Sequence, residues 1–402
     1  MRGKPSNGFL ERVLEPLIVR LISLKVGHGY GDGYGNGRSR DMEFDTARYS
    51  GCMVRSHSKF CSCAIALMFF LPNADAKEKP PVGIVAASAG DFVFMVDPTT
   101  GNSRSIPSGP VAWLFPAPGG ILFAPDLVNG RTTVLDLRTM TPRDPIPGVT
   151  MPRFGSSTDR YLVLAKQLLV MSYPDRALMN RFEIPFEHPW QVAVLADNTV
   201  LIVLERLPDA GSEASMIAVN LTEGRLVYRS ALGGDVRHFA LSVTLGVMAL
   251  AQAEGNQVIV VDPATLTPAA VFPAKGKPID LVFAEDGSTL VVAVELPDGG
   301  GELLIWKIKA EKKEGLQKKR EWTVPLASAP LRLAGSPDGR HVAVGLASGE
   351  LQIVELEKQT LVATASLRTA PRDVVWCDPS TEGPLLPDWS DDDAPTLGLG
   401  GR

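Results

Sequence analysis

The chain has 402 residues, and 45% of them are hydrophobic, which is typical of a folded globular protein rather than a disordered one. Its formal net charge of -5 offers no basic surface of the kind that nucleic acids attract, so no nucleic-acid partner is expected. The 38 glycines and 32 prolines favour many short strands joined by turns over long helices.

Residues 1–52 form an extension whose role is open to two interpretations. Apolar residues between Phe9 and Leu21 follow helical spacing, although Pro16 would kink such a helix. The Gly- and Tyr-rich stretch GHGYGDGYGNG follows and predicts no packed fold. The extension is either an amphipathic N-terminal helix or a mis-assigned, non-structured segment ahead of a translation start at Met53, and we favour the second interpretation.

Residues 53–76 have the three parts of a secretory signal peptide. Arg55 and Lys59 supply positive charge, 60–71 (FCSCAIALMFFL) is apolar, and 74–76 (ADA) matches a signal-peptidase site. The apolar run is shorter than the roughly 20 residues of a spanning helix, which favours a cleaved signal over a membrane anchor. The sequence therefore predicts a periplasmic or secreted protein that does not span the membrane after cleavage.

Residues 329–365 contain the clearest of several internal repeats. The tight turn at 336–339 (SPDG) precedes a short apolar strand at 341–346. A second turn leads to 351–356, where apolar and polar residues alternate, and a third leads to the last strand at 361–365. The unit therefore predicts four short antiparallel strands.

Weaker copies of this unit precede it along the chain. They occupy 109–146, 151–184, 188–228, 234–272 and 277–309. An anchor residue comes just before an apolar strand in each of these six units and once more after the last of them: Pro110, Pro152, Pro189, Asp235, Pro278, Pro330 and Pro371. The anchors recur at intervals of roughly 40–50 residues, the length of a four-stranded propeller blade.

The two ends of the repeat region each contain an incomplete unit. Strands are expected at 82–87, 91–96 and 103–106 without an anchor, whereas Pro371 is followed by a single strand at 373–376. One blade shared between the termini would close the ring and remove exposed strand edges. We therefore expect one domain over 77–381, followed by a flexible acidic tail over 382–402.

The repeat resembles the YVTN and WD-repeat families in its SPDG turn, its GELQIVEL strand and the turn that follows. This resemblance implies an all-β fold, namely a seven-bladed β-propeller of four-stranded antiparallel blades with the last blade shared between the termini. It implies little about activity, because propellers host many unrelated functions.

Aligning the anchors predicts which side chains surround the mouth of the central channel. The residue two places after each anchor is Ala112, Phe154, Gln191, Arg237, Asp280, Arg332 or Asp373, and the five polar ones form the candidate ligand-binding set: Gln191, Arg237, Asp280, Arg332 and Asp373. Arg153, Arg372 and His238 lie next to this set and would add positive charge. The set is either a self-satisfied charge network between blades or a polar pocket for a small anion or a partner's loop, because Arg binds carboxylates in a bidentate manner.

These patterns are compatible with two classes of function. The first is an exported binding or scaffold module for a protein partner or small polar ligand, favoured because we find no catalytic constellation, metal-ligand spacing or cofactor motif. The second is an enzyme resembling lactonase-type or quinoprotein and amine-dehydrogenase-type propellers. We assign no catalytic residue, metal ligand or cofactor, and we expect Cys377 to be a packed residue rather than a nucleophile.

Overall fold

The computed structural model describes residues 81–380, apart from 148–150, 155–158, 165–166, 185, 187–188, 196–199, 207–212 and 312–314. The extension, the signal segment and the acidic tail lie outside the described residues. All described residues belong to one compact unit. Every regular element in the described part of the chain is a β-strand.

Six antiparallel sheets account for these strands, and most strands pair with their neighbours in sequence. One sheet has the order β28 (Pro371–Cys377), β1 (Ile84–Ala89), β2 (Phe92–Val96) and β3 (Ser103–Pro107). The next contains β4 (Phe115–Ala117), β5 (Ile121–Asp126), β6 (Arg131–Asp136), β7 (Thr141–Pro142) and β8 (Ile146–Pro147). A third contains β9 (Arg153–Phe154), β10 (Arg160–Leu164), β11 (Leu168–Ser172) and β12 (Leu178–Phe182).

The remaining strands form three further sheets. One contains β13 (Pro189–Leu195), β14 (Val200–Arg206), β15 (Glu213–Asn220), β16 (Arg225–Ser242), β17 (Val247–Gln252), β18 (Gln257–Val261) and β19 (Pro268–Pro273). Another contains β20 (Lys277–Phe283), β21 (Thr289–Glu295), β22 (Gly301–Glu311) and β23 (Gly315–Leu326). The last contains β24 (Pro330–Gly335), β25 (His341–Leu346), β26 (Glu350–Glu355) and β27 (Thr360–Ser366).

The long strand β16 takes part in two successive sets of strands. Its first part, from Arg225 to Asp235, pairs with β15, and its second part, from Val236 to Ser242, pairs with β17. The seven-stranded sheet therefore contains two successive strand quartets that share this strand, the outer strand of one quartet continuing as the inner strand of the next.

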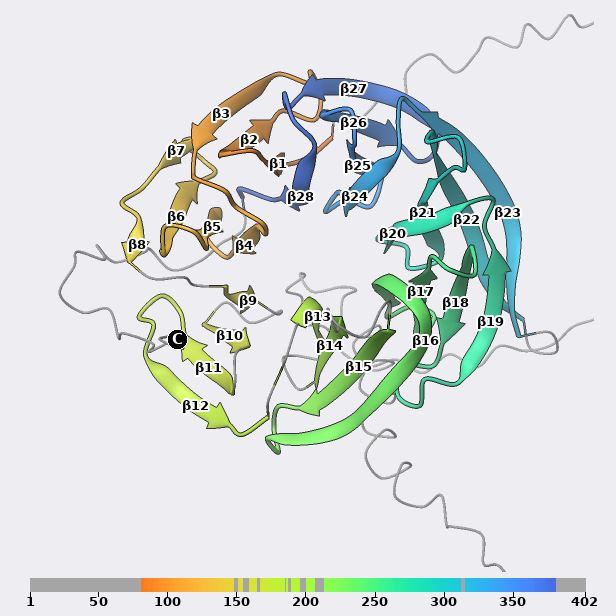
Figure 1. The fold of residues 1–402 in the computed structure, drawn as a ribbon, viewed down its shortest axis with the longest axis horizontal. Helices are drawn as coiled ribbons and strands as arrows, with labels where there is room; N and C mark the ends of the chain where they lie inside the picture. The colour runs from red at the N-terminus through yellow and green to blue at the C-terminus, as the bar shows by residue number, and fades with distance from the viewer. Residues whose placement is uncertain are drawn as a thin grey trace, which may run out of the picture. The chain divides into compact units, whose positions relative to one another are not determined.

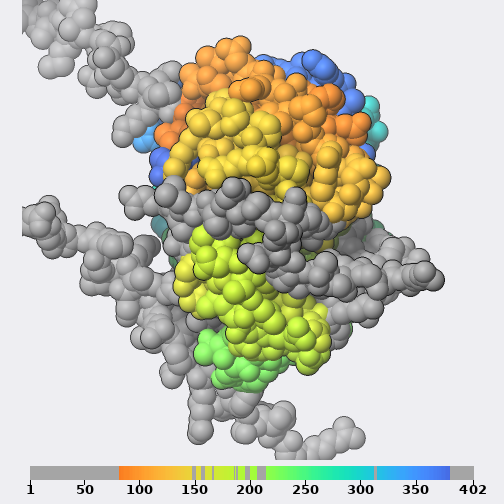
Figure 2. Space-filling view, turned by 90° about the vertical axis from the view of Figure 1, so that its left-hand side faces the viewer, coloured from red at the N-terminus to blue at the C-terminus, as the bar shows by residue number. Residues whose placement is uncertain are grey.

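The sheets are arranged around a central axis, as Figure 1 shows. One strand of each sheet lies nearest the axis, except that the seven-stranded sheet contributes two, β13 and the second part of β16. These inner strands contact one another in the order β28, β4, β9 and β13, and again from β16 through β20 and β24 back to β28. Figure 2 shows the side of the ring on which the orange and yellow strands of residues 84–147 lie above the yellow-green strands β10–β12. The inner strands thus bring residues from distant parts of the sequence to one centre.

The hydrophobic core lies between adjacent sheets rather than in one central mass. Along β22, Leu303 and Ile305 pack toward the following sheet, whereas Leu304 and Trp306 pack toward the preceding one. Successive side chains of a strand point to opposite faces, so a strand that is covered on both faces needs a continuous apolar run. This requirement explains why the middle strands are almost uniformly hydrophobic in sequence.

The expected turn at 336–339 forms and is held by its own side chains. The hydroxyl of Ser336 contacts the carboxylate of Asp338 at 2.5 Å and accepts a hydrogen bond from the backbone N–H of His341 at 2.9 Å. Gly339 has a φ of 62°, a left-handed conformation that glycine adopts without strain.

The expected sharing of one sheet between the two ends of the repeat region is confirmed. β28 pairs antiparallel with β1, with Val85 opposite Trp376 and Ile84 opposite Cys377. The indole N–H of Trp376 also donates a hydrogen bond to the carbonyl of Val82 at 2.7 Å. The C-terminal strand therefore closes the ring as the inner strand of the sheet that the N-terminal strands begin.

Removing residues 371–402 should open the ring, because β1 would lose its partner and expose an unpaired strand edge that invites aggregation. We expect a large fall in melting temperature and oligomers in size-exclusion chromatography. The matched truncation, removal of 381–402 only, keeps every described strand and should leave the protein monomeric and as stable as the full chain. Equal stability and monomeric behaviour of the two truncations would contradict ring closure by β28.

Candidate functional site

Five inner strands carry a β-bulge at the same place, near the start of the strand or, in β16, near the start of its second part. In each case two consecutive residues of the neighbouring strand pair with residues i and i+2 of the inner strand, so residue i+1 is extra and has no partner in the register. The extra residues are Trp190, Arg237, Ile279, Leu331 and Arg372. The repeated bulge sets the register in which the next side chain points toward its neighbours around the channel.

The structurally equivalent residues after the bulge differ at one position from the set expected from the sequence. They are Gln191, His238, Asp280, Arg332 and Asp373. His238 takes the place expected for Arg237, because Val236 and not Asp235 occupies the position of the anchor prolines. Arg237 is itself the bulged residue, and its guanidinium pairs with the carboxylate of Asp235 at 2.8 Å.

Three members of this set link their inner strand to the next one around the ring. The side-chain amide of Gln191 accepts a hydrogen bond from Phe239 N and donates one to Phe239 O, both at 2.7 Å. The carboxylate of Asp280 accepts from Leu333 N at 2.9 Å, and that of Asp373 accepts from Leu114 N at 2.8 Å. Each side chain therefore satisfies a backbone N–H of the neighbouring strand or of the segment that leads into it.

Asp280 makes more contacts than the other members of this set. Only 1% of its surface is exposed, and it accepts a second backbone hydrogen bond, from Leu281 N at 2.7 Å. The imidazole Nδ1 of His238 contacts the same carboxylate at 2.6 Å. Asp280 thus connects β16, β20 and β24, and its oxygens are occupied by protein donors.

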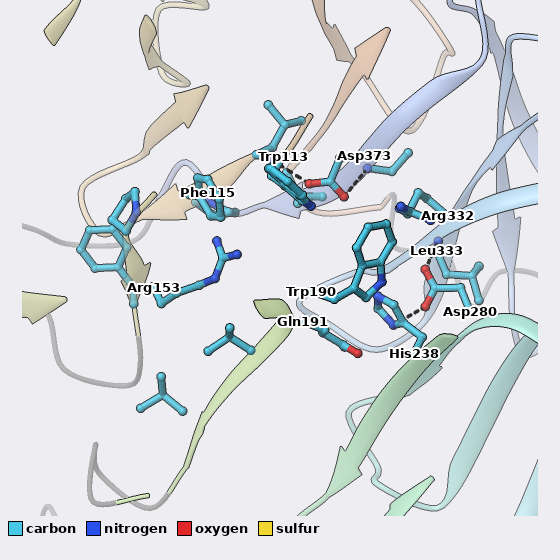
Figure 3. Close-up of a pocket in the computed structure, with 18 residues that line it drawn as sticks. Trp113, Phe115, Arg153, Trp190, Gln191, His238, Asp280, Arg332, Leu333 and Asp373 are labelled. Carbon is cyan, nitrogen blue, oxygen red and sulfur yellow. Dashed lines mark hydrogen bonds and ion pairs between the residues drawn. The ribbon is translucent and has the colours of Figure 1, made fainter. Parts of the chain in front are cut away.

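A cavity of about 300 Å³ lies at the centre of this arrangement, and Gln191, His238, Asp280, Arg332 and Asp373 all line it. Aromatic side chains form much of the remaining wall, as Figure 3 shows. Trp113 and Trp190 meet edge to face with ring centroids 6.5 Å apart. The cavity therefore combines apolar walls with a few charged groups, the usual composition of a small-molecule site.

Two arginines carry the positive charge of the cavity. The guanidinium of Arg153 lies 4.1 Å from the ring centroid of Phe115, and that of Arg332 lies 5.4 Å from the ring of Trp190. Arg332 also donates a hydrogen bond to the carbonyl of Leu331 at 2.8 Å. Among the described carboxylates, none forms an ion pair with either guanidinium.

Burial perturbs the charged groups of the cavity. It raises the pKa of Asp373 to about 6, although the hydrogen bond from Leu114 and the charges of Arg332 and Arg153 act in the opposite direction. Burial also lowers the pKa of Arg153 to about 10, which leaves this side chain charged at neutral pH. Protonation of Asp373 below about pH 6 removes a negative charge and makes the cavity more positive.

Some residues that line the cavity were predicted from the sequence only as neighbours of the candidate set, and others were not predicted at all. Arg153 lines the cavity, whereas Arg372 is exposed and contributes nothing to its wall. Trp113, Phe115 and Trp190 were not expected there. Trp190 directly follows the anchor Pro189, a position that the repeat alignment could have indicated.

Other features of the described residues bear on the kind of site. No three His, Cys, Asp or Glu side chains gather there as metal ligands. Within the same residues, no helical segment has the length and hydrophobicity to cross a bilayer. Cys377 is 2% exposed, and burial raises the pKa of its thiol to about 12.

Comparison with known proteins identifies the fold. No family model matches the chain, and no curated protein matches it in sequence. Solved structures similar to it include Kuenenia stuttgartiensis hydrazine synthase, with a TM-score of 0.54, 14% identity, and coverage of 67% of this chain and 90% of that chain. The Cps50 (Swd1) β-propeller domain from Myceliophteria thermophila gives a TM-score of 0.53, 15% identity, and 69% and 93% coverage.

A functionally unknown protein from Desulfotomaculum acetoxidans is similar over 74% of this chain and 99% of that chain, with a TM-score of 0.56 and 11% identity. The strand arrangement and these neighbours define the chain as an all-β protein with the β-propeller fold. At these identities the similarity concerns the fold alone.

The Asp280→Ala substitution should destabilise the protein by about 3 kcal/mol, because it leaves the buried Leu333 N–H without an acceptor and His238 without its carboxylate. Chemical denaturation measures this change in the free energy of unfolding. Asp91→Ala is the matched control, since Asp91 is exposed in a turn. Equal stability of the two variants would show that Asp280 does not hold the inner strands together.

Proposed function

We propose that this β-propeller is a binding module whose central cavity takes a small organic anion with an apolar body. The proposal depends on one observation, namely that two arginines line the cavity without a contacting carboxylate among the described residues. Arg153 and Arg332 both line the cavity, and neither forms an ion pair with a described carboxylate. The charge of Asp373 acts on both guanidinium groups, but no described carboxylate contacts them, so a ligand carboxylate supplies the direct partner.

The rest of the cavity suits such a ligand in shape and chemistry. A guanidinium matches a carboxylate in planar, bidentate geometry, which a lysine would not provide. Trp113 and Trp190 present large apolar surfaces against which a flat group packs. The oxygens of Asp280 and Asp373 accept hydrogen bonds from the backbone and not from the arginines, although the charge of Asp373 still acts on both guanidinium groups.

Benzoate is a suitable probe, and its binding should quench tryptophan fluorescence, since two tryptophans line the cavity. Arg332→Gln should weaken binding by about tenfold to hundredfold, because a hydrogen bond to a charged group contributes about 1.5–3 kcal/mol. Arg372→Gln removes an exposed arginine from an equivalent strand and should leave the dissociation constant unchanged.

Benzamide is the matched neutral ligand and should bind far more weakly than benzoate. The proposal fails if benzoate does not bind the folded wild-type protein. It fails equally if the Arg332→Gln and Arg372→Gln variants bind benzoate alike while both retain the melting temperature of the wild type.

We also infer that the ring has seven blades built from repeats similar to those of the YVTN and WD families. The inference is supported by the seven anchors in the sequence and by β16, whose two parts serve successive strand quartets. Counting those quartets separately turns the six sheets into seven blades. An experimental structure with any other number of blades would refute this count.

We further propose that the protein is exported to the periplasm or beyond, on the strength of the signal pattern in 53–76. A ligand-binding module outside the cytoplasm would meet small anions directly from the surroundings. Mass spectrometry of the purified native protein should find its N-terminus at Lys77 or within a few residues of it. A mature chain that retains residues 1–52 would contradict both the signal and the interpretation of the extension.

A further inference from the structure

A second cavity, of about 380 Å³, adjoins the central one. Trp190 and Arg332 line both cavities, so these two side chains form the wall between them. Their contact, with the guanidinium 5.4 Å from the ring centroid, lies at this boundary. A ligand group held by Arg332 is therefore next to both spaces.

The second cavity is mainly aliphatic, which distinguishes it from the central one. Its wall includes Ile279 and Leu331, the bulged residues of β20 and β24. Ala329, Pro330 and Ala347 complete the apolar part. A surface of this kind binds apolar groups by excluding water from them.

The charged residues of the second cavity do not favour a second anion. Arg237 is paired with Asp235 at 2.8 Å, so its charge is already balanced. Glu295 adds a negative charge at the same cavity and would repel a carboxylate. The site therefore has one anion-binding end, at Arg332, and one apolar end.

From this arrangement we propose that the natural ligands are amphiphilic monocarboxylates. Their carboxylate binds Arg332, and an aliphatic chain of several methylenes passes Trp190 and fills the second cavity. This inference rests on the proposed function, since it uses the same arginine, and it adds the class of ligand.

The test measures the affinity of butanoate, octanoate and octanedioate by competition with benzoate. Each methylene that becomes fully buried strengthens binding about fourfold. Octanoate should therefore bind at least tenfold more tightly than butanoate. Octanedioate has the same length with a second carboxylate, and it should lose most of that gain.

Ala347→Phe should fill the second cavity, because Ala347 lines it, and the exposure of Ala347 lets the fold accept a larger side chain. In this variant octanoate should bind no better than butanoate, whereas benzoate, which occupies the central cavity, should bind as it does to the wild type. Ala310→Phe makes the same change at an exposed position on β22 that lines neither cavity. This control should keep the full dependence on chain length.

The outcomes separate the two proposals. If benzoate does not bind the wild-type protein, the proposed function fails and this inference fails with it. If benzoate binds but octanoate gains nothing over butanoate, only the inference fails. A gain that persists in Ala347→Phe, or that octanedioate shares in full, would likewise overturn it, because the chain would then lie outside the second cavity.

Discussion

The unpaired edge of each inner strand is the constraint on which the centre of this propeller depends. Where sheets surround a channel, the innermost strand of each has one neighbour within its sheet, and the backbone N–H groups on its other edge need acceptors. Gln191, Asp280 and Asp373 supply these acceptors to the next strand around the ring. The bulge before each of them turns the side chain toward that neighbour.

The use of Asp280 and Asp373 as acceptors for backbone N–H groups has an electrostatic consequence for the cavity. Two carboxylates that face two arginines would ordinarily form ion pairs and cancel their charge. Here the oxygens of Asp280 and Asp373 are held by backbone donors, so Arg153 and Arg332 face the cavity without a paired carboxylate among the described residues. The same contacts that stabilise the ring thereby leave both guanidinium groups without a contacting carboxylate at its centre, where aromatic side chains form much of the wall.

The sequence predicted most of the fold, because its signals are local. The turn at 336–339 contains its own hydrogen-bonding side chains, and the apolar run of β22 follows from burial on both faces. The sharing of a sheet between the ends followed from counting strands. The turn and the apolar run depend on residues that are close in sequence, and the shared sheet was predicted because each end of the repeat region contains an incomplete unit.

The candidate site was predicted less completely, because register and convergence are tertiary properties. Asp235 looked like an anchor, but Val236 takes that position, so His238 and not Arg237 reaches the cavity. The repeat pattern does not mark a bulge, and a shift of one residue sends a side chain to the other face. Trp113 belongs to no repeated motif, so only the folded ring shows that it meets Trp190.

A crystal structure of the protein soaked with 4-bromobenzoate would test the central claim most directly, because anomalous scattering locates the bromine independently of the protein density. We predict a single strong bromine peak in the central cavity, with the carboxylate within hydrogen-bonding distance of Arg332 or Arg153 and the ring beside Trp113 and Trp190. A well-ordered cavity without bromine, or bromine bound only elsewhere on the protein, would contradict the proposed binding site.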